Sequence, residues 1–207
     1  MSKKANFSNI YKFYDLINTV ITLGFDKSWR KKAVNNLIGT SVLDLGSGTG
    51  AAFDQLIDYE TIAIDPDKKM LELNSFENKV LGSAENLPFE DNTFDNVFCS
   101  FVWRNVSDTK KALHEVYRVL KPGGKFVLLD MTRPHNPILK MLHKIGTFKV
   151  LHLIGLLTFN LKEYRFLYKS LDFYPQPENH LDKDNFIDFK IERMGLFNFV
   201  YLAVFTK

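Results

Sequence analysis

The sequence predicts an α/β fold: a doubly wound, mostly parallel sheet with helices on both faces. Apolar segments with the composition of strands alternate with helical patterns for about 90 residues, as in βαβ units. The first of these strands ends in a glycine-rich loop, GSGTG, directly before a predicted helix. Folds of this class bind ligands beyond the carboxyl ends of their strands. A chain of 207 residues fits one such domain.

Two helices are expected before the first strand, because apolar side chains recur at helical spacing over residues 8–20 and from Trp29 to Leu37. The predicted strands are 41–45, 61–65, 80–81, 94–101, 125–131 and two within 189–207. The predicted helices between them are 51–58, one beginning at Asp65 or Asp67, one capped by Ser107 and ended by LKPGG, and the helical segment 134–172. The single domain 1–207 thus comprises N-terminal helices (1–38), a cofactor-binding core (39–130), a lid (131–172) and two last strands (186–207).

The composition is that of an ordinary globular protein, and it narrows the partners and the compartment. A net charge of +3 is too small to indicate nucleic-acid binding. Cys99 is the single cysteine, which excludes an intramolecular disulfide, and its apolar surroundings predict a buried thiol. The uncharged run between Lys149 and Lys162 is too short to span a bilayer, which takes about 20 residues. We therefore expect a cytoplasmic protein, soluble or attached to a membrane surface.

The glycine loop by itself allows two interpretations. Gly46, Gly48 and Ala51 satisfy the dinucleotide pattern GxGxxG/A, and the acidic Asp65 follows at about the right distance. However, Asp44 stands two residues before the first glycine, where a carboxylate suits a ligand with an ammonium group and repels a pyrophosphate. The segment GSAENLPF follows the third predicted strand, where it can edge an adenine.

The motifs D-L-G-S-G-T-G, I-D-P-D-K-K-M-L, A-E-N-L-P-F and L-K-P-G-G resemble, in order and spacing, those of class I S-adenosylmethionine-dependent methyltransferases, whose fold is Rossmann-like. The resemblance implies a seven-stranded sheet whose last strand is antiparallel. It also implies that Asp44 binds the methionine amino group, Asp65 the ribose hydroxyls, and Ser83 and Ala84 the adenine. Ser83 departs from the family's usual Asp or Asn. Asp65 has a second interpretation, as a helix cap. The cofactor-binding set implied is Tyr14, Asp44, Gly46, Ser47, Gly48, Thr49, Asp65, Pro66, Ser83, Ala84 and Ser100, with no metal.

A narrower resemblance covers nearly the whole chain. Y-D-L-I-N, G-F-D-K-S-W-R and F-V-W-R-N-V-S-D followed by K-A-L-H-E-V-Y-R-V-L-K-P-G-G are similar to the ubiquinone/menaquinone biosynthesis C-methyltransferases. F-K-V-L-H-L-I-G and Y-R-F-L-Y-K-S-L resemble the lid of that family. His152 stands in place of a usual proline and Asp130 in place of a usual glutamate, and the segment from Pro175 to Asp184 replaces a helix.

This resemblance implies methyl transfer to a ring carbon of a polyprenyl hydroquinone, with demethylmenaquinol to menaquinol as the leading reaction. A neighbouring phenol, with a pKa of about 10, must lose its proton, and a buried cation stabilises the phenolate. We expect Arg104 and Asn105 to be catalytic, because Arg104 follows the strand that faces the cofactor. Arg104 can hold the phenolate or orient a water; alternatively it pairs structurally with Asp108 or another acid. Tyr14 would close over the methionine end.

The predicted lid is basic and apolar. Residues 131–171 hold seven basic side chains against one acid, Glu163. Basic charge among Leu, Ile and Phe is typical of a helix that lies on an anionic membrane, although an ordinary lid with solvated lysines has the same composition. A homodimer is also compatible with this sequence. The alternative functions are methylation of an oxygen or nitrogen nucleophile, and a non-catalytic S-adenosylmethionine-binding subunit.

Overall fold

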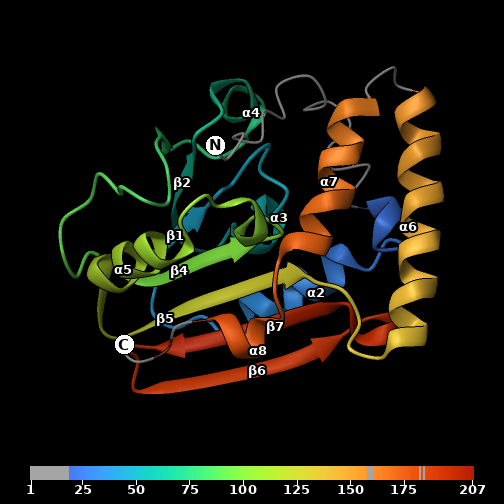
Figure 1. The fold of residues 1–207 in the computed structure, drawn as a ribbon. Helices are drawn as coiled ribbons and strands as arrows, with labels where there is room; N and C mark the ends of the chain where they lie inside the picture. Colours follow the sequence, from blue (N-terminus) through green and yellow to red (C-terminus); the bar gives the residue numbers. More distant parts are fainter. Residues whose placement is uncertain (1–18, 158–160, 182, 184) are drawn as a thin grey trace.

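The computed structural model describes residues 19–157, 161–181, 183 and 185–207. Its centre is a seven-stranded sheet in the order β3-β2-β1-β4-β5-β7-β6 (Figure 1). The strands are β1 Ser41–Leu45, β2 Glu60–Asp65, β3 Lys79–Leu81, β4 Phe94–Ser100, β5 Leu120–Met131, β6 Asp188–Met194 and β7 Val200–Thr206. Neighbouring strands are parallel except that β7 runs antiparallel to both β5 and β6. The predicted doubly wound, mostly parallel sheet is confirmed.

Helices cover both faces of this sheet (Figure 1). The helices are α2 Asp26–Val34, α3 Phe53–Leu56, α4 Lys68–Leu73, α5 Thr109–Val119, α6 Pro137–Leu157, α7 Leu161–Phe173 and α8 Pro177–His180, with the 3-10 turns η1 Trp103–Asn105 and η2 Leu196–Asn198. The first predicted helix, 8–20, and with it Tyr14, lies almost entirely outside the described residues.

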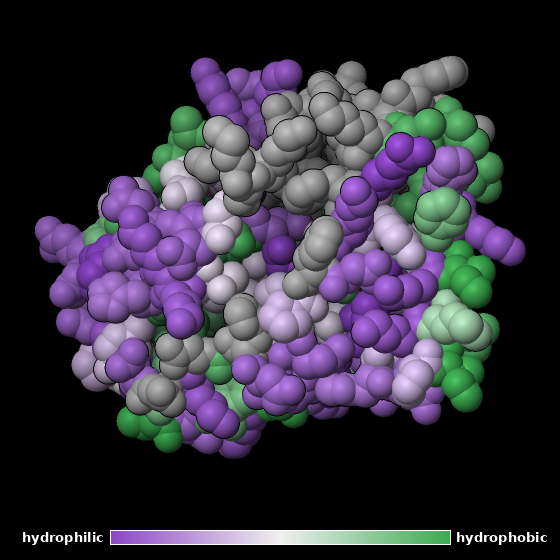
Figure 2. Space-filling model, viewed as in Figure 1, coloured by the Kyte–Doolittle hydropathy of each residue, from purple (hydrophilic) through white to green (hydrophobic). Residues whose placement is uncertain are grey.

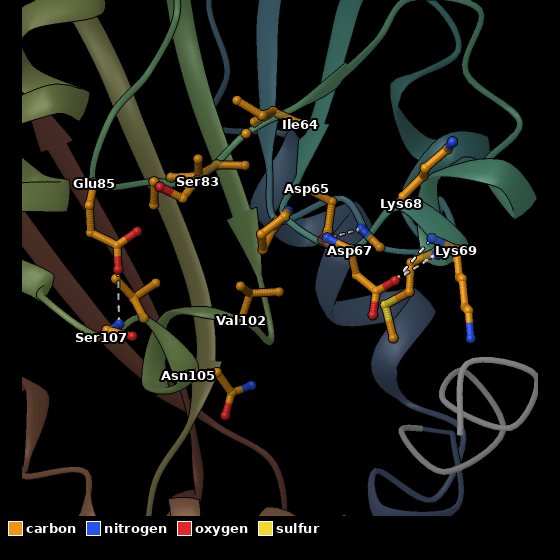
Figure 3. Close-up of a pocket in the computed structure, with 18 of the residues that line it drawn as sticks. Ile64, Asp65, Asp67, Lys68, Lys69, Ser83, Glu85, Val102, Asn105 and Ser107 are labelled. Carbon is orange, nitrogen blue, oxygen red and sulfur yellow. Dashed lines mark hydrogen bonds between the residues drawn. The ribbon is translucent and has the colours of Figure 1, made fainter. Parts of the chain in front are cut away.

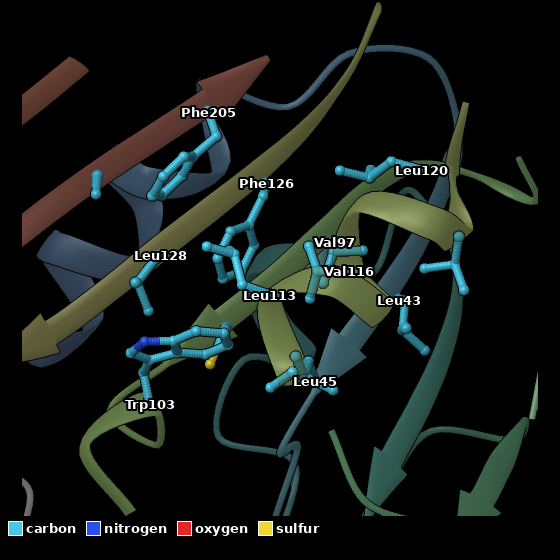
Figure 4. Packing of buried hydrophobic residues seen from close by; sticks show 14 of the residues in the cluster. Leu43, Leu45, Val97, Trp103, Leu113, Val116, Leu120, Phe126, Leu128 and Phe205 are labelled. Atoms are coloured by element: carbon cyan, nitrogen blue, oxygen red, sulfur yellow. The ribbon is translucent and has the colours of Figure 1, made fainter. Parts of the chain in front are cut away.

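The alternation of side chains along each strand divides the core into two clusters. Leu43, Val97 and Leu128 point to the face covered by α5, in a cluster that also contains Trp103 and Phe126 (Figure 4). Their neighbours Val42, Phe98 and Val127 point to the opposite face, where Trp29 and Ala33 of α2 cover them. Successive strand residues point to opposite faces, so a parallel strand buried on both sides is apolar throughout. Cys99 is fully buried in the first cluster, as predicted.

Three element boundaries differ from the sequence prediction. Asp108, not Ser107, caps α5, because its carboxylate accepts a hydrogen bond from the Lys111 N–H at 3.0 Å. The LKPGG segment does not separate α5 from the next strand; it is the first part of β5, which begins at Leu120. The helix predicted at 51–58 is reduced to Phe53–Leu56. A short helix, α8, occupies part of the segment between Pro175 and Asp184.

The segment predicted as a lid forms α6 and α7, which stand side by side beyond the carboxyl ends of β4 and β5 (Figure 1). Leu151 of α6 packs against Tyr164 and Leu167 of α7 in a small core of its own. Among the helices of the described residues, none combines the length and apolar character that crossing a bilayer requires.

Candidate functional site

The glycine loop joins β1 to α3 in a backbone conformation that favours glycine. Gly46, Gly48 and Gly50 have φ of +72°, +53° and +87°. A Cβ on Gly46 would lie 2.4 Å from Cγ1 of Val102, so a larger residue there would collide with the chain after β4. Asn74 holds the loop from the other side by donating to the Ser47 hydroxyl and to the Gly48 carbonyl, both at 3.1 Å. The sequence pattern did not indicate Asn74.

A cavity of about 770 Å³ opens beyond the carboxyl ends of β1, β2 and β3 (Figure 3). Seven of the predicted site residues line it: Gly46, Gly48, Asp65, Pro66, Ser83, Ala84 and Asn105. Met70, Glu85, Val102, Val106 and Ser107 also line it, and the sequence prediction did not include them. The remaining predicted residues that the structure describes lie outside the lining: Asp44, Ser47, Thr49, Ser100 and Arg104.

Asp65 ends β2 and ties the loop to the next helix. One carboxylate oxygen accepts the Gly48 N–H at 2.9 Å and the other accepts the Asp67 N–H at 2.8 Å. Asp67, not Asp65, caps α4, with its carboxylate accepting the N–H groups of Lys69 and Met70 (Figure 3). The helix-cap interpretation of Asp65 is therefore wrong. Burial raises the pKa of Asp65 to about 6, against the two backbone hydrogen bonds that lower it.

Asp44 is a buried carboxylate on β1, only 2% exposed. Its Oδ2 has no hydrogen-bond partner among the described residues. Burial raises the pKa of this group to about 7; the positive charge of Arg30 lowers it and the negative charge of Asp65 raises it further. An unpaired buried carboxylate oxygen is costly, and a ligand that carries an ammonium group would satisfy it.

Ser83 and Ala84 follow β3 at the other end of the cavity. Ser83 forms an isolated bridge with Asn86, and the Glu85 carboxylate accepts the Ser107 N–H at 3.1 Å (Figure 3). This contact joins the loop after β3 to the loop after η1. Together with Ile64 and Val106, Ala84 makes this end apolar, which suits the face of a flat ring.

Arg104 and Asn105 belong to η1 but differ in their surroundings. Asn105 lines the cavity, and its Oδ1 is buried with no partner among the described residues. The Arg104 guanidinium forms an ion pair with Asp130 and donates to the Phe101 carbonyl at 2.9 Å; its side chain is only 4% exposed. The expected orientation toward the cleft is not observed, because the fully buried Asp130 carboxylate requires a cation. The acid is Asp130, not Asp108.

Two other buried arginines were not singled out individually by the sequence prediction. Arg30 of α2 donates from Nε to the hydroxyl of Ser100 at 3.3 Å. Ser100, which was predicted to bind the cofactor, therefore has a partner within the protein. Arg133 pairs with Asp172 at 2.8 Å and donates to Thr147, and is 2% exposed. One of the seven basic residues of segment 131–171 is therefore internal and cannot contribute to an exposed basic surface. Burial beside Arg133 lowers the pKa of His143 to about 4.

A family model described as the ubiE/COQ5 methyltransferase family matches residues 2–186. The chain belongs to this family. It is 35% identical to a ubiquinone/menaquinone biosynthesis C-methyltransferase of Rickettsia bellii (strain OSU 85-389), with 83% of this chain and 78% of that one aligned. The enzyme of the same name from Haemophilus ducreyi is 34% identical, over 83% and 74% of the two chains.

Solved structures with the same fold include S-adenosylmethionine-dependent methyltransferases of Thermotoga maritima and Aquifex aeolicus. The first has a TM-score of 0.69 at 20% identity and covers 98% of this chain and 100% of its own. The second has a TM-score of 0.55 at 18% identity and covers 94% and 96%. This member of the ubiE/COQ5 family is an S-adenosylmethionine-dependent methyltransferase, which decides between the two interpretations of the glycine loop.

The site fits that cofactor. The unpaired oxygen of Asp44 matches an ammonium group, and Gly46 and Gly48 line the cavity without side chains. Asp65 lines the cavity, where its carboxylate can accept hydrogen bonds from ribose hydroxyls beside the two backbone N–H groups it already accepts. Within the described part of the chain, no group of His, Cys, Asp and Glu is arranged to hold a metal ion.

Proposed function

We propose that the chain methylates a ring carbon of a polyprenyl hydroquinone, with demethylmenaquinol to menaquinol as its reaction. The observation that carries the chemistry is the buried, unpaired carboxylate of Asp44 beside the glycine loop, since it is built for a cationic cofactor. The substrate class rests on the shared family and on the name of the Rickettsia bellii relative.

In this proposal the cofactor residues act as the resemblance implies. Asp44 binds the methionine amino group, Gly46, Ser47, Gly48 and Thr49 approach the methionine moiety, Asp65 and Pro66 face the ribose, and Ser83 and Ala84 edge the adenine. Ser100 completes the set on β4, and Tyr14 closes the methionine end. The bound cofactor supplies an electrophilic methyl group. The chain's own residues have to bind it, orient the acceptor carbon and exclude water.

The proposed catalytic pair is Arg104 and Asn105. Asn105 presents a buried carbonyl oxygen at the cavity wall, where it can accept a hydrogen bond from a quinol hydroxyl. Arg104 cannot act as a base, because a guanidinium stays protonated. From its pair with Asp130 it holds the turn that presents Asn105; stabilising a quinolate directly would require it to leave that pair.

The test is methyl transfer by the purified chain from methyl-labelled S-adenosylmethionine to reduced demethylmenaquinone, with the labelled position assigned by NMR. We expect label on a ring carbon. Label on oxygen, or turnover of amines alone, would indicate the other methyltransferase class. Tight binding of S-adenosylhomocysteine without turnover of any hydroquinone would support a non-catalytic subunit. Extraction of a strain lacking the gene should show an accumulated demethylated quinone, whose head group identifies the substrate.

The partner proposed for the lid is an anionic membrane surface. The outward face of α6 exposes large apolar side chains: Ile138, Met141, Leu142, Ile145, Leu153 and Leu156. Figure 2 shows this apolar surface as green along the side where α6 lies in Figure 1. The inward face packs through His143, Thr147 and Leu151, so the helix has a clear inside and outside. Exposed apolar patches of this kind mark interaction surfaces.

The charges around this face favour a lipid surface over a second copy of the chain. Lys149 is exposed within the apolar stripe, and Lys140, Arg165 and Lys169 are exposed nearby on α6 and α7. In a two-fold dimer through this face, like charges would oppose each other. At a membrane, lysine side chains extend to the headgroups and each contributes about 1 kcal/mol with anionic lipid. The proposed lipid-tailed substrate would reach the site from that surface.

Vesicle sedimentation tests this partner. The chain should bind vesicles with anionic lipid at low salt, less at high salt, and should not bind neutral vesicles as well. Leu142→Gln with Ile145→Gln should weaken binding about tenfold or more, since each removes apolar burial. Ile57→Gln with Ile187→Gln, at apolar positions elsewhere that are more exposed than Leu142 and Ile145, should not weaken it. Equal binding to both lipids excludes the electrostatic part, and a dimer lost only in the α6 variant would show that a second copy covers this face.

A further inference from the structure

Arg30 is a buried cation near the cofactor end of the sheet, and the proposed function gives it no role. It lies on α2, is 2% exposed, and donates from Nη1 to Asp26 Oδ2 at 2.7 Å. Its Nε donates to the Ser100 hydroxyl at 3.3 Å, and its Cζ lies 5.0 Å from the ring centre of Phe101. These contacts fix the guanidinium between α2 and the end of β4.

The same guanidinium acts on Asp44. Asp44 of β1 pairs in register with Phe98 of β4, two residues before Ser100. The Asp44 carboxylate and the Ser100 hydroxyl that Arg30 contacts therefore lie at the same end of neighbouring strands. The charged groups that act on Asp44 are Arg30, which stabilises its anion, and Asp65, which opposes it. The buried thiol of Cys99 has a pKa well above its usual range and stays neutral. Arg30 is therefore the positive charge that offsets burial.

Arg30 acts on Asp44 through its charge and not through a hydrogen bond. Among the described residues, Arg30 makes its ion pair with Asp26 and none with Asp44, and the Asp44 Oδ2 atom keeps no partner. A direct Arg30–Asp44 pair would occupy the oxygen that an incoming ammonium group needs.

We propose that Arg30 is a positioning residue of the cofactor site. Its fixed charge favours the anionic form of Asp44, and its contacts with Asp26 and Ser100 keep the guanidinium off Asp44 Oδ2, which stays open for the cofactor's ammonium group. The inference rests on the proposed role of Asp44. It adds α2 to a site whose other parts come from the loops after the strands, and it assigns a function to the G-F-D-K-S-W-R segment.

The test compares wild type with the double variant Asp26→Asn/Arg30→Met, because removing both charges together leaves neither an unpaired buried carboxylate at residue 26 nor an arginine free to pair with Asp44. S-adenosylhomocysteine affinity is measured by calorimetry from pH 6 to pH 9. Without Arg30 the protonation of Asp44 should move up by about one pH unit. The double variant should then bind about tenfold more weakly than wild type at pH 6 and within about twofold at pH 9. The titration of the ligand and of Asp65 affects both proteins equally, so it cancels in the ratio of their affinities.

Two further measurements keep the inference falsifiable. In the ligand-free protein, NMR of the Asp44 carboxyl carbon should show the same upward movement, and Arg30→Lys should keep the wild-type midpoint because it keeps the charge. An unmoved Asp44 midpoint, or affinity lost equally at every pH, would overturn the proposal and leave Arg30 structural. Wild-type protein that fails to bind S-adenosylhomocysteine would instead contradict the cofactor site itself.

Discussion

Two regions at the carboxyl ends of the strands treat buried charge in opposite ways. At the ends of β1 and β2, Asp44 and Asp65 are buried, and no lysine or arginine of the described residues forms an ion pair with either. Burial raises their pKa values to about 7 and about 6. At the end of β5, Asp130 is paired with Arg104, and Arg133 with Asp172, whose pKa its partner holds below the usual range.

The unpaired carboxylates suit ligand binding, whereas the paired ones suit a structural role. A protein that buries a carboxylate without a partner loses stability unless a ligand compensates for it, whereas a paired carboxylate supports the fold. In the proposed function, the unpaired charge of the β1–β2 region serves a cationic ligand. The paired charges after β5 join that end of the sheet to η1, α6 and α7. Substitutions in the two regions should have opposite effects on stability.

The largest effect is expected in the paired region. Arg104→Ala leaves the Asp130 carboxylate buried and unpaired, so the free energy of unfolding should fall by about 3–5 kcal/mol in urea titration. Lys32→Ala, which breaks an exposed pair with Glu192, is the control and should change it by no more than about 1 kcal/mol. If Arg104→Ala is as stable as wild type, and its turnover alone falls by roughly 10²–10³, the guanidinium acts on substrate as an oxyanion partner does.

Asp44→Asn should raise the free energy of unfolding of the ligand-free protein. The folded Asp44 binds a proton up to about pH 7, whereas the unfolded group releases it near 3.8, so this group makes the ligand-free protein less stable as the pH rises through that window. At pH 8 Asp44→Asn should be more stable than wild type by roughly 2–4 kcal/mol, with the difference vanishing near pH 4. Affinity for S-adenosylhomocysteine at pH 8 should fall by about 1.5–3 kcal/mol.

Asp95→Asn is the matched control for Asp44. Lys121 and the Ser41 N–H hold the pKa of Asp95 below its usual range, so its stabilisation is present above the unfolded pKa and is lost as the pH falls. The control should lose stability at neutral pH and keep cofactor affinity. A destabilised Asp44→Asn protein would contradict the contrast between the two regions.

The smallest effect concerns Asp65. Asp65→Ala should weaken S-adenosylhomocysteine binding by about 1–3 kcal/mol in calorimetry, the cost of a lost buried hydrogen-bond pair. Asp67→Ala removes the cap of α4 and should cost about 1 kcal/mol of stability. Equal cofactor affinity in Asp65→Ala and wild type would remove Asp65 from the site.

Much of the fold and of the cofactor cavity follows from local sequence patterns. The apolar strands and the glycine loop are local features, and their order predicts the sheet and the edge at which the cavity opens. The boundaries at Asp108 and Leu120 did not follow, because two adjacent residues can each cap a helix and a Pro-Gly-Gly segment can either end a helix or continue as strand. Tertiary packing decides between them.

The sequence by itself determined which residue types stand where the chain turns from strand to loop: Asp44, the glycines, Asp65 and the Arg104-Asn105 pair. Only the tertiary structure decided what each charge faces. Arg104 lies on Asp130, 26 residues away, and Arg30 reaches Ser100 over 70 residues. Such partners are set by how helices pack on the sheet, and a buried charge turns to the nearest opposite charge because water is absent there.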